Sequence, residues 1–184
     1  MEALLNSFLL VFAGEMGDKT QLLALILAAR YRKPWTILTG VFIATILNHA
    51  LASYVGAFVS SFFAESTLRY ALAGIFFVFA AWILVPDKEE ELKTSRRFGP
   101  LMTTIIAFFL AEMGDKTQLA TVALGAEYAR QIWLVTIGTT LGMMASNALA
   151  IFLGDRLLAK IPMQKVRIGA SILFAIFGLG ILLV

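Results

Sequence analysis

The octapeptide Glu15-Met16-Gly17-Asp18-Lys19-Thr20-Gln21-Leu22 recurs unchanged at residues 112–119. Each copy lies in the middle of a stretch that is long and apolar enough to cross a bilayer. An ionised side chain at the bilayer centre costs about 2.5–3.5 kcal/mol on insertion scales, so such residues normally face a polar cavity and mark ion or proton pathways. The two copies of the motif are therefore the candidate functional site.

Composition sets the class of protein. Sixty per cent of the 184 residues are hydrophobic and 15% are charged, and the charged residues gather in short intervals, which is typical of a membrane protein with several spans. The chain has no cysteine, which excludes disulfides, thiolate metal sites and thiol redox chemistry. The net charge of +3 does not indicate a nucleic-acid partner, because the basic residues lie between apolar spans and are better explained as topology signals.

Six stretches are long enough to cross the lipid, which takes about 20 apolar residues in a helix. They are residues 4–29, 35–63, 68–85, 101–126, 132–153 and 166–184. Pro34, Pro86, Pro100 and Pro162 lie at or beside the boundaries, where proline is tolerated best. The first residues lack the basic segment of a cleavable signal peptide, so we expect the first span to be retained. The sequence thus predicts an all-α membrane protein with six transmembrane helices.

The duplication extends beyond the motif. At a constant offset of 98 residues, Trp35 matches Trp133 and Phe76 matches Phe174. We expect two three-helix repeats, residues 1–85 and 101–184, joined by a charged cytoplasmic linker at residues 86–100. An odd number of crossings makes the second repeat enter the membrane from the opposite side. Inverted repeats of this kind build midplane sites in many secondary transporters.

Lysine and arginine predict the orientation in the membrane. One side collects Arg30, Arg32, Lys33, Lys88, Lys93, Arg96, Arg97, Arg156, Lys160, Lys165 and Arg167, and the other has Arg69 and Arg130. The positive-inside rule makes the first side cytoplasmic. Both termini are then expected to be extracytoplasmic.

Oxygen-bearing side chains recur at a spacing of three within each copy of the motif. They are Glu15, Asp18 and Gln21 in the first copy and Glu112, Asp115 and Gln118 in the second. On a continuous helix, residues three apart share a face, so the two faces converge if the first and fourth spans cross near their centres. Hard oxygen donors suit magnesium, calcium or manganese, whereas zinc is less favoured without cysteine.

The remaining motif residues each have two interpretations. Gly17 and Gly114 either break the helix and free backbone carbonyls as ligands, or they allow close packing against a neighbouring helix. Thr20 and Thr117 either ligate a cation or hydrogen-bond to the preceding turn of their own helix.

Lys19 and Lys116 each follow a glutamate by four residues, which favours an intrahelical ion pair that balances the acid. The alternative is that a lysine occupies the empty site as a tethered cation. Four acids and two lysines leave a formal charge of −2, which one divalent cation neutralises. Carboxylates clustered in a low dielectric take up protons when the metal leaves, so cation/proton exchange is expected, without any cofactor.

Polar residues also fall in the middle of the second and fifth spans. Asn48 and Asn147 are further candidate ligands, and His49 and Ser146 lie beside them. Interhelical hydrogen bonding without function is an equal alternative for these side chains.

Two complete copies of Glu-x-Gly-Asp-(Lys/Arg)-(Thr/Ser) in a short protein with six spans resemble the GDT family of membrane cation/proton exchangers. That family includes eukaryotic Golgi manganese and calcium exchangers and bacterial manganese exporters. The resemblance implies transport of manganese or calcium coupled to protons. The size of this chain resembles that of the bacterial manganese exporters more than that of the organelle proteins.

The resulting hypothesis is a secondary antiporter that exports Mn²⁺ across the bacterial inner membrane in exchange for protons. Glu15, Asp18, Glu112 and Asp115 would bind the metal, and some of these carboxylates would take the protons. A Ca²⁺/H⁺ antiporter, a passive divalent-cation channel, a non-transporting membrane assembly subunit and an amino-acid exporter are alternatives. No nucleophile with a partnered base is visible, so an enzyme is not expected. The small size permits a homodimer.

Overall fold

A computed structural model describes residues 1–85, 98–154 and 162–183. All regular structure within these ranges is helical, which confirms the predicted all-α class. Residues 86–97 of the predicted linker, the basic residues Arg156 and Lys160, and Val184 lie outside the described residues.

The helices follow the predicted spans, with two exceptions. In chain order they are α1 (Glu2–Glu15), α2 (Lys19–Tyr31), α3 (Pro34–Ser60), α4 (Glu65–Trp82), α5 (Pro100–Glu112), α6 (Lys116–Glu127), the 3₁₀ turn η1 (Ala129–Gln131), α7 (Ile132–Leu153) and α9 (Met163–Leu183). The first and fourth predicted spans are each divided into two helices, α1–α2 and α5–α6. Pro34–Ser60, Ala129–Leu153 and Met163–Leu183 are each long and apolar enough to cross a membrane. The count of six crossings stays a prediction.

Prolines set two of the boundaries as expected. Pro34 and Pro100 occupy the first turns of α3 and α5, where the missing backbone N–H has no intrahelical acceptor to lose.

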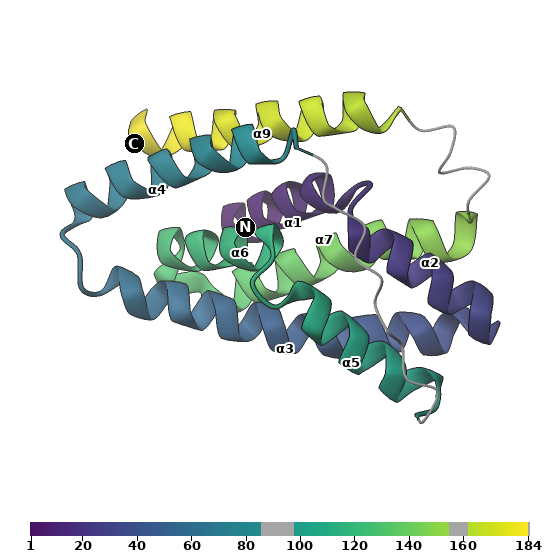
Figure 1. The fold of residues 1–184 in the computed structure, drawn as a ribbon. Coiled ribbons are helices and arrows are strands. Elements are labelled where there is room, and N and C mark those ends of the chain that lie inside the picture. Colours follow the sequence, from purple (N-terminus) through teal and green to yellow (C-terminus); the bar gives the residue numbers. More distant parts are fainter. Residues whose placement is uncertain (86–97, 155–161, 184) are drawn as a thin grey trace.

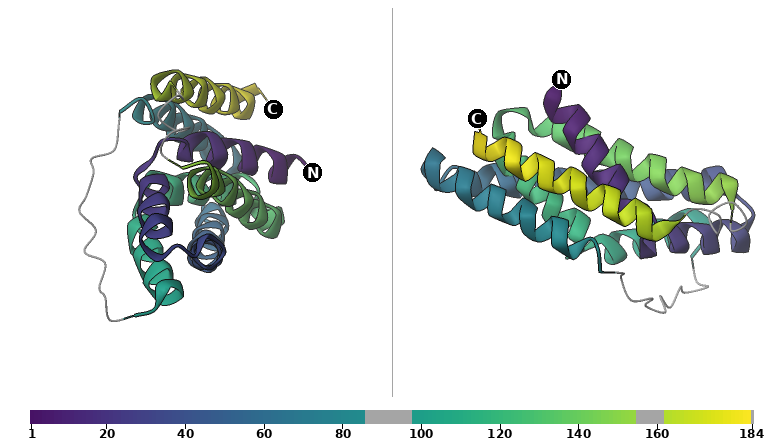
Figure 2. Two further views of the ribbon diagram at one scale, coloured as in Figure 1. Left: turned by 90° about the vertical axis from the view of Figure 1, so that its right-hand side faces the viewer. Right: turned by 90° about the horizontal axis from the view of Figure 1, so that it is seen from above.

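The helices are arranged in layers (Figures 1 and 2). Helices α4 and α9 pack side by side as an outer layer, which we call the α4–α9 layer, and it contacts α1 and α6. Helix α1 packs along α7, α3 packs along α6, and α3 crosses α7. Small residues permit these close approaches, since a Cβ at Gly56 of α3 would overlap the backbone carbonyl of Val122 in α6. Packing of this kind holds helices together in lipid, where apolar burial alone gives little drive.

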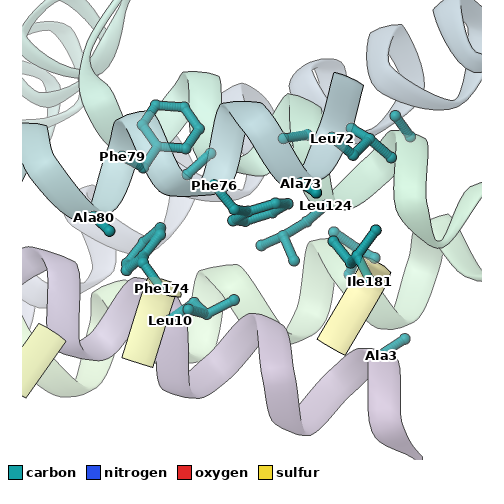
Figure 3. Packing of buried hydrophobic residues seen from close by; sticks show 14 residues of the cluster. Ala3, Leu10, Leu72, Ala73, Phe76, Phe79, Ala80, Leu124, Phe174 and Ile181 are labelled. Carbon is teal, nitrogen blue, oxygen red and sulfur yellow. The ribbon is translucent and has the colours of Figure 1, made fainter. Parts of the chain in front are cut away.

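Two hydrophobic clusters lie on either side of the motif along each broken helix. The first cluster, shown in Figure 3, takes residues from α1, α4, α6, α7 and α9. The second takes residues from α2, α3 and α5. On α1–α2 the chain passes from Leu10 in the first cluster, through the motif, to Leu23 in the second. On α5–α6 it passes in the reverse order, from Phe108 to Leu124. Both copies of the motif are thus held between the two apolar clusters.

Candidate metal centre

Each motif copy folds as a tight turn that ends one helix and begins the next. In the first copy Met16 has φ −67° and ψ 113°, Gly17 has φ 79°, and the Asp18 N–H donates to the Glu15 carbonyl at 3.2 Å. These values match a type II β-turn, whose third residue requires positive φ and therefore glycine. The second copy repeats the turn, with Gly114 at φ 79° and an Asp115 N–H to Glu112 carbonyl distance of 3.2 Å.

The structure thus shows the helix break at both glycines, which the sequence had left open. Metal ligation by the backbone carbonyls of the break stays a prediction. The break also corrects the expectation that Glu15, Asp18 and Gln21 share the face of one continuous helix. Glu15 ends α1, whereas Gln21 belongs to α2. The acids are brought together by the turn rather than by helical periodicity.

The glutamines hold the turns. The Oε1 atom of Gln21 accepts the N–H of Gly17 at 3.0 Å, and Oε1 of Gln118 accepts the N–H of Gly114 at 2.7 Å. The Nε2 group of Gln21 also donates to the Ser146 carbonyl of α7 at 2.9 Å. The amide oxygens that the sequence predicted as metal donors thus accept backbone N–H groups, and the first turn is tied to α7.

Three carboxylates converge at the breaks. Oxygens of Glu15, Glu112 and Asp115 all lie within 4.8 Å of one another. Glu15 and Glu112 are fully buried and Asp115 is 9% exposed. This spacing suits a single cation bridged by carboxylate oxygens. We call these three residues the acid triad.

Asp18 lies beside the acid triad rather than in it. With Asp115, Lys116 and Thr117 it lines a cavity of about 20 Å³, which is enough for one water molecule or one small ion. The structure therefore brings together three of the four predicted carboxylates and sets the fourth at the edge of an adjoining small cavity.

The two threonines of the motif both serve Glu15. Thr20 donates to one carboxylate oxygen at 2.7 Å, and Thr117, from the second copy, donates to the other oxygen over a short contact. The sequence predicted only a cation or the preceding turn of the same helix as the partner of each threonine hydroxyl. The bond from Thr117 links the two copies of the motif directly at the site.

Glu112 has no such support. Neither of its carboxylate oxygens has a hydrogen-bond partner among the described residues, although both are buried. A buried carboxylate without a partner is costly when ionised. Glu112 thus needs either a cation or a proton.

The lysines have partners that differ from the predicted intrahelical pairs. The Lys19 ammonium lies 2.9 Å from Asp115 of the other copy, and Lys116 donates to the Val85 carbonyl at 3.0 Å. The expected spacing of four residues on a helix does not arise, because α1 ends at Glu15 and α2 begins at Lys19. An ammonium therefore already contacts one carboxylate of the acid triad, as the tethered-cation alternative requires.

The polar residues of α3 and α7 are buried close to the motifs. Asn48 donates to the Phe109 carbonyl of α5 at 3.1 Å, and Asn147 donates to the Met143 carbonyl of its own helix at 3.0 Å. The Oδ1 atoms of both residues and both ring nitrogens of His49 have no hydrogen-bond partner within the described part of the chain. These amides are thus available as acceptors, but the acid triad does not include them.

Apolar helices that are broken at buried acids and pack around a common cation-sized site define an integral membrane ion transporter. The family model described as "Divalent cation/proton antiporter GDT1" matches residues 3–91 and 100–184. The chain belongs to this family, which confirms the resemblance drawn from the two signatures. It is a divalent cation transporter of the membrane and not an enzyme.

Several relatives match over nearly the whole chain. A Vibrio cholerae protein described as "Putative manganese exporter" is 42% identical over 98% of this chain and 90% of its own length. "GDT1-like protein 3" of Arabidopsis thaliana is 31% identical over 97% of this chain and 70% of its own length. A GDT1-like protein of Synechocystis is 27% identical, covering 97% of this chain and 95% of the relative. No solved structure matches the chain.

Proposed function

We propose that the protein exports Mn²⁺ from the cytoplasm in exchange for protons, with the acid triad as the shared site. The observation that carries the proposal is Glu112, a buried carboxylate without a hydrogen-bond partner among the described residues, within 4.8 Å of two further carboxylates. Such a carboxylate can exchange a bound cation for a proton, because either one compensates its buried negative charge.

The donor chemistry narrows the choice of ion, and one relative supports manganese. The acid triad offers hard carboxylate oxygens, which suit manganese, calcium and magnesium. The relative with 42% identity is described as a manganese exporter, and this supports manganese among the three. The same relative comes from a bacterium, which supports placement in a bacterial inner membrane. The arrangement proposed for that membrane, six spans in two inverted repeats with both termini extracytoplasmic, is supported by the sequence duplication and the distribution of basic residues.

Asp18 completes the path to the site in this proposal. It shares the small cavity with Asp115, so a cation released by the acid triad meets a fourth carboxylate before leaving. In the metal-free state the Lys19 ammonium pairs with the Asp115 carboxylate. The entering cation displaces this ammonium.

The test is metal-dependent proton movement in proteoliposomes, compared across Mn²⁺, Ca²⁺, Mg²⁺ and Zn²⁺. An exchanger drives protons against their gradient when a manganese gradient is imposed, whereas a passive channel does not. Asp115→Asn, Asp18→Asn and Glu112→Gln are each expected to abolish this flux while the protein remains folded by size-exclusion chromatography. Glu90→Gln, in the predicted linker, is the matched control and should keep it. Unchanged flux in the three site variants would rule out the assignment.

A further inference from the structure

A second and larger cavity lies at the end of the molecule that holds both termini. Its volume is about 930 Å³, and it is lined by Glu2 of α1, Glu65 and Arg69 of α4, Glu127 and Tyr128 beside the end of α6, and Ile181 of α9. Three carboxylates and one guanidinium give this partly apolar cavity an excess of negative charge. We call it the terminal chamber.

The terminal chamber and the small cavity beside Asp18 occupy successive levels of the same helices. On α1, Glu2 and Asn6 line the terminal chamber, whereas Gly14 lines the small cavity. On α6 the order is reversed, from Ala120 at the small cavity to Glu127 at the terminal chamber. The two cavities therefore lie along one line that begins at the acid triad.

Apolar side chains separate the two cavities. Phe76 of α4 and Leu124 of α6 lie along their helices between the residues that line the two cavities, and Leu10 of α1 and Phe174 of α9 form part of the wall of the small cavity. Each of the four is at most 3% exposed. Figure 3 shows them within the first hydrophobic cluster. The rings of Phe76 and Phe174 have centroids 6.2 Å apart. We call these four residues the apolar plug.

The α4–α9 layer contacts some helices of the bundle much more than others. Helix α4 packs against α6 and α9 packs against α1, whereas neither packs comparably against α2 or α5 within the described residues. The α4–α9 layer is thus held against α1 and α6, and at the level of the motif it is tied to the bundle by the bond from Lys116 to the Val85 carbonyl and by Met163 beside Gly17. Separating it from α1 and α6 would open the apolar plug without disturbing the packing of α1 on α7 or α3 on α6.

We propose that the apolar plug is the closed gate between the metal site and the terminal chamber, and that the α4–α9 layer moves to open it. The proposal rests on the proposed function for the identity of the ion. A dry constriction of leucine and phenylalanine blocks a hydrated cation by dewetting. The carboxylates of the terminal chamber then hold a cation that has passed. By the predicted orientation this gate faces the cell exterior.

Single-cysteine labelling tests the gate without measuring transport, and the natural chain has no cysteine to remove. Ser66→Cys lines the terminal chamber and Ala120→Cys lines the small cavity. A cationic, membrane-impermeant methanethiosulfonate is applied to the face from which Ser66→Cys reacts. We expect Ala120→Cys to be protected. Adding Phe76→Ala or Leu124→Ala should raise its labelling rate at least about tenfold, which corresponds to about 1.4 kcal/mol in the closing equilibrium.

Phe58→Ala is the matched control, because Phe58 is 56% exposed on α3 and should leave Ala120→Cys protected. An unchanged elution volume in size-exclusion chromatography shows that the plug variants are folded. The gate is overturned if Ala120→Cys reacts as fast as Ser66→Cys with the apolar plug intact. It is equally overturned if both plug variants leave Ala120→Cys protected.

A cross-link provides a second experiment that leaves the four residues of the apolar plug unchanged. The rings of Tyr128, beyond α6, and Phe177, in α9, have centroids 6.3 Å apart across the two layers. Joining Tyr128→Cys to Phe177→Cys with a short bis-methanethiosulfonate should stop Mn²⁺ transport in liposomes, and reduction should restore it. Full transport in the cross-linked protein overturns the gate. Absent Mn²⁺ transport in the natural chain counts against the proposed function instead, and the labelling experiment still decides the gate.

Discussion

The two turn glycines offer a matched pair of substitutions. Gly17 and Gly114 both have φ 79°, and an L-residue in the left-handed region costs about 1–2 kcal/mol. Their surroundings differ. A Cβ at Gly114 meets nothing within 4 Å, whereas a Cβ at Gly17 meets the Met163 sulfur at 2.8 Å. We expect Gly114→Ala to lower the free energy of unfolding by the backbone cost alone.

Gly17→Ala should cost more than Gly114→Ala. Overpacking typically adds about 1–3 kcal/mol to the loss of stability. The additional loss at Gly17 should lie near the lower end of this range, because the side chain of Met163 at the start of α9 is flexible and adapts readily. Chemical unfolding of the purified protein in detergent measures both values. Combining Gly17→Ala with Met163→Ala should remove the excess and leave the backbone cost, which a double-mutant cycle detects.

Asparagine separates the backbone effect from the effect of size. It tolerates positive φ better than alanine does, so Gly114→Asn should destabilise the protein less than Gly114→Ala despite its larger side chain. A larger loss for asparagine, or a larger loss at Gly114 than at Gly17 for alanine, would refute the turn as the reason for glycine at these positions.

Three further predictions follow from contacts at the site. Thr20→Val and Thr117→Val should each weaken Mn²⁺ binding and stability by a similar amount in binding and unfolding titrations, about 1.5–3 kcal/mol for a hydrogen bond to a charged group. The control Thr39→Val loses only an exposed bond to the Trp35 carbonyl and should change neither quantity. Lys19→Gln should tighten Mn²⁺ binding measured by calorimetry and slow its release, because the ammonium at 2.9 Å from Asp115 competes with the metal; weaker binding would make Lys19 a supporting group only. Gln118→Leu should cost about 1 kcal/mol of stability through the lost Gly114 bond, and an unchanged unfolding midpoint would contradict that role.

The sequence predicted the features that depend on local chemistry. Prolines at 34 and 100 begin helices, and the all-helical class and the family follow from composition and two signatures. The sequence permitted two interpretations of Gly17, and the residues around it favour the helix break. The order Glu-Met-Gly-Asp has glycine at the third position of a four-residue turn, where type II geometry requires it.

Contacts between the repeats could not be predicted in the same way. Thr117 bonds to Glu15, and Lys19 pairs with Asp115, across 102 and 96 residues of chain. Spacing within one motif carries no information about which copy supplies a partner. Once the helix is broken, the periodicity that had placed Asp18 beside Glu15 no longer applies, and Asp18 lies at the edge of the small cavity instead.

The two motif copies have one sequence and two environments. Glu15 accepts two threonine hydroxyls, one from each copy, whereas Glu112 accepts none within the described residues. Identical octapeptides cannot favour either arrangement by themselves, so the difference must come from the rest of the chain. The clearest inequality there is the α4–α9 layer, which packs on α1 and α6 rather than on α2 and α5. It contacts the two copies unequally, because Met163 of α9 lies against Gly17, whereas a Cβ at Gly114 would meet nothing within 4 Å.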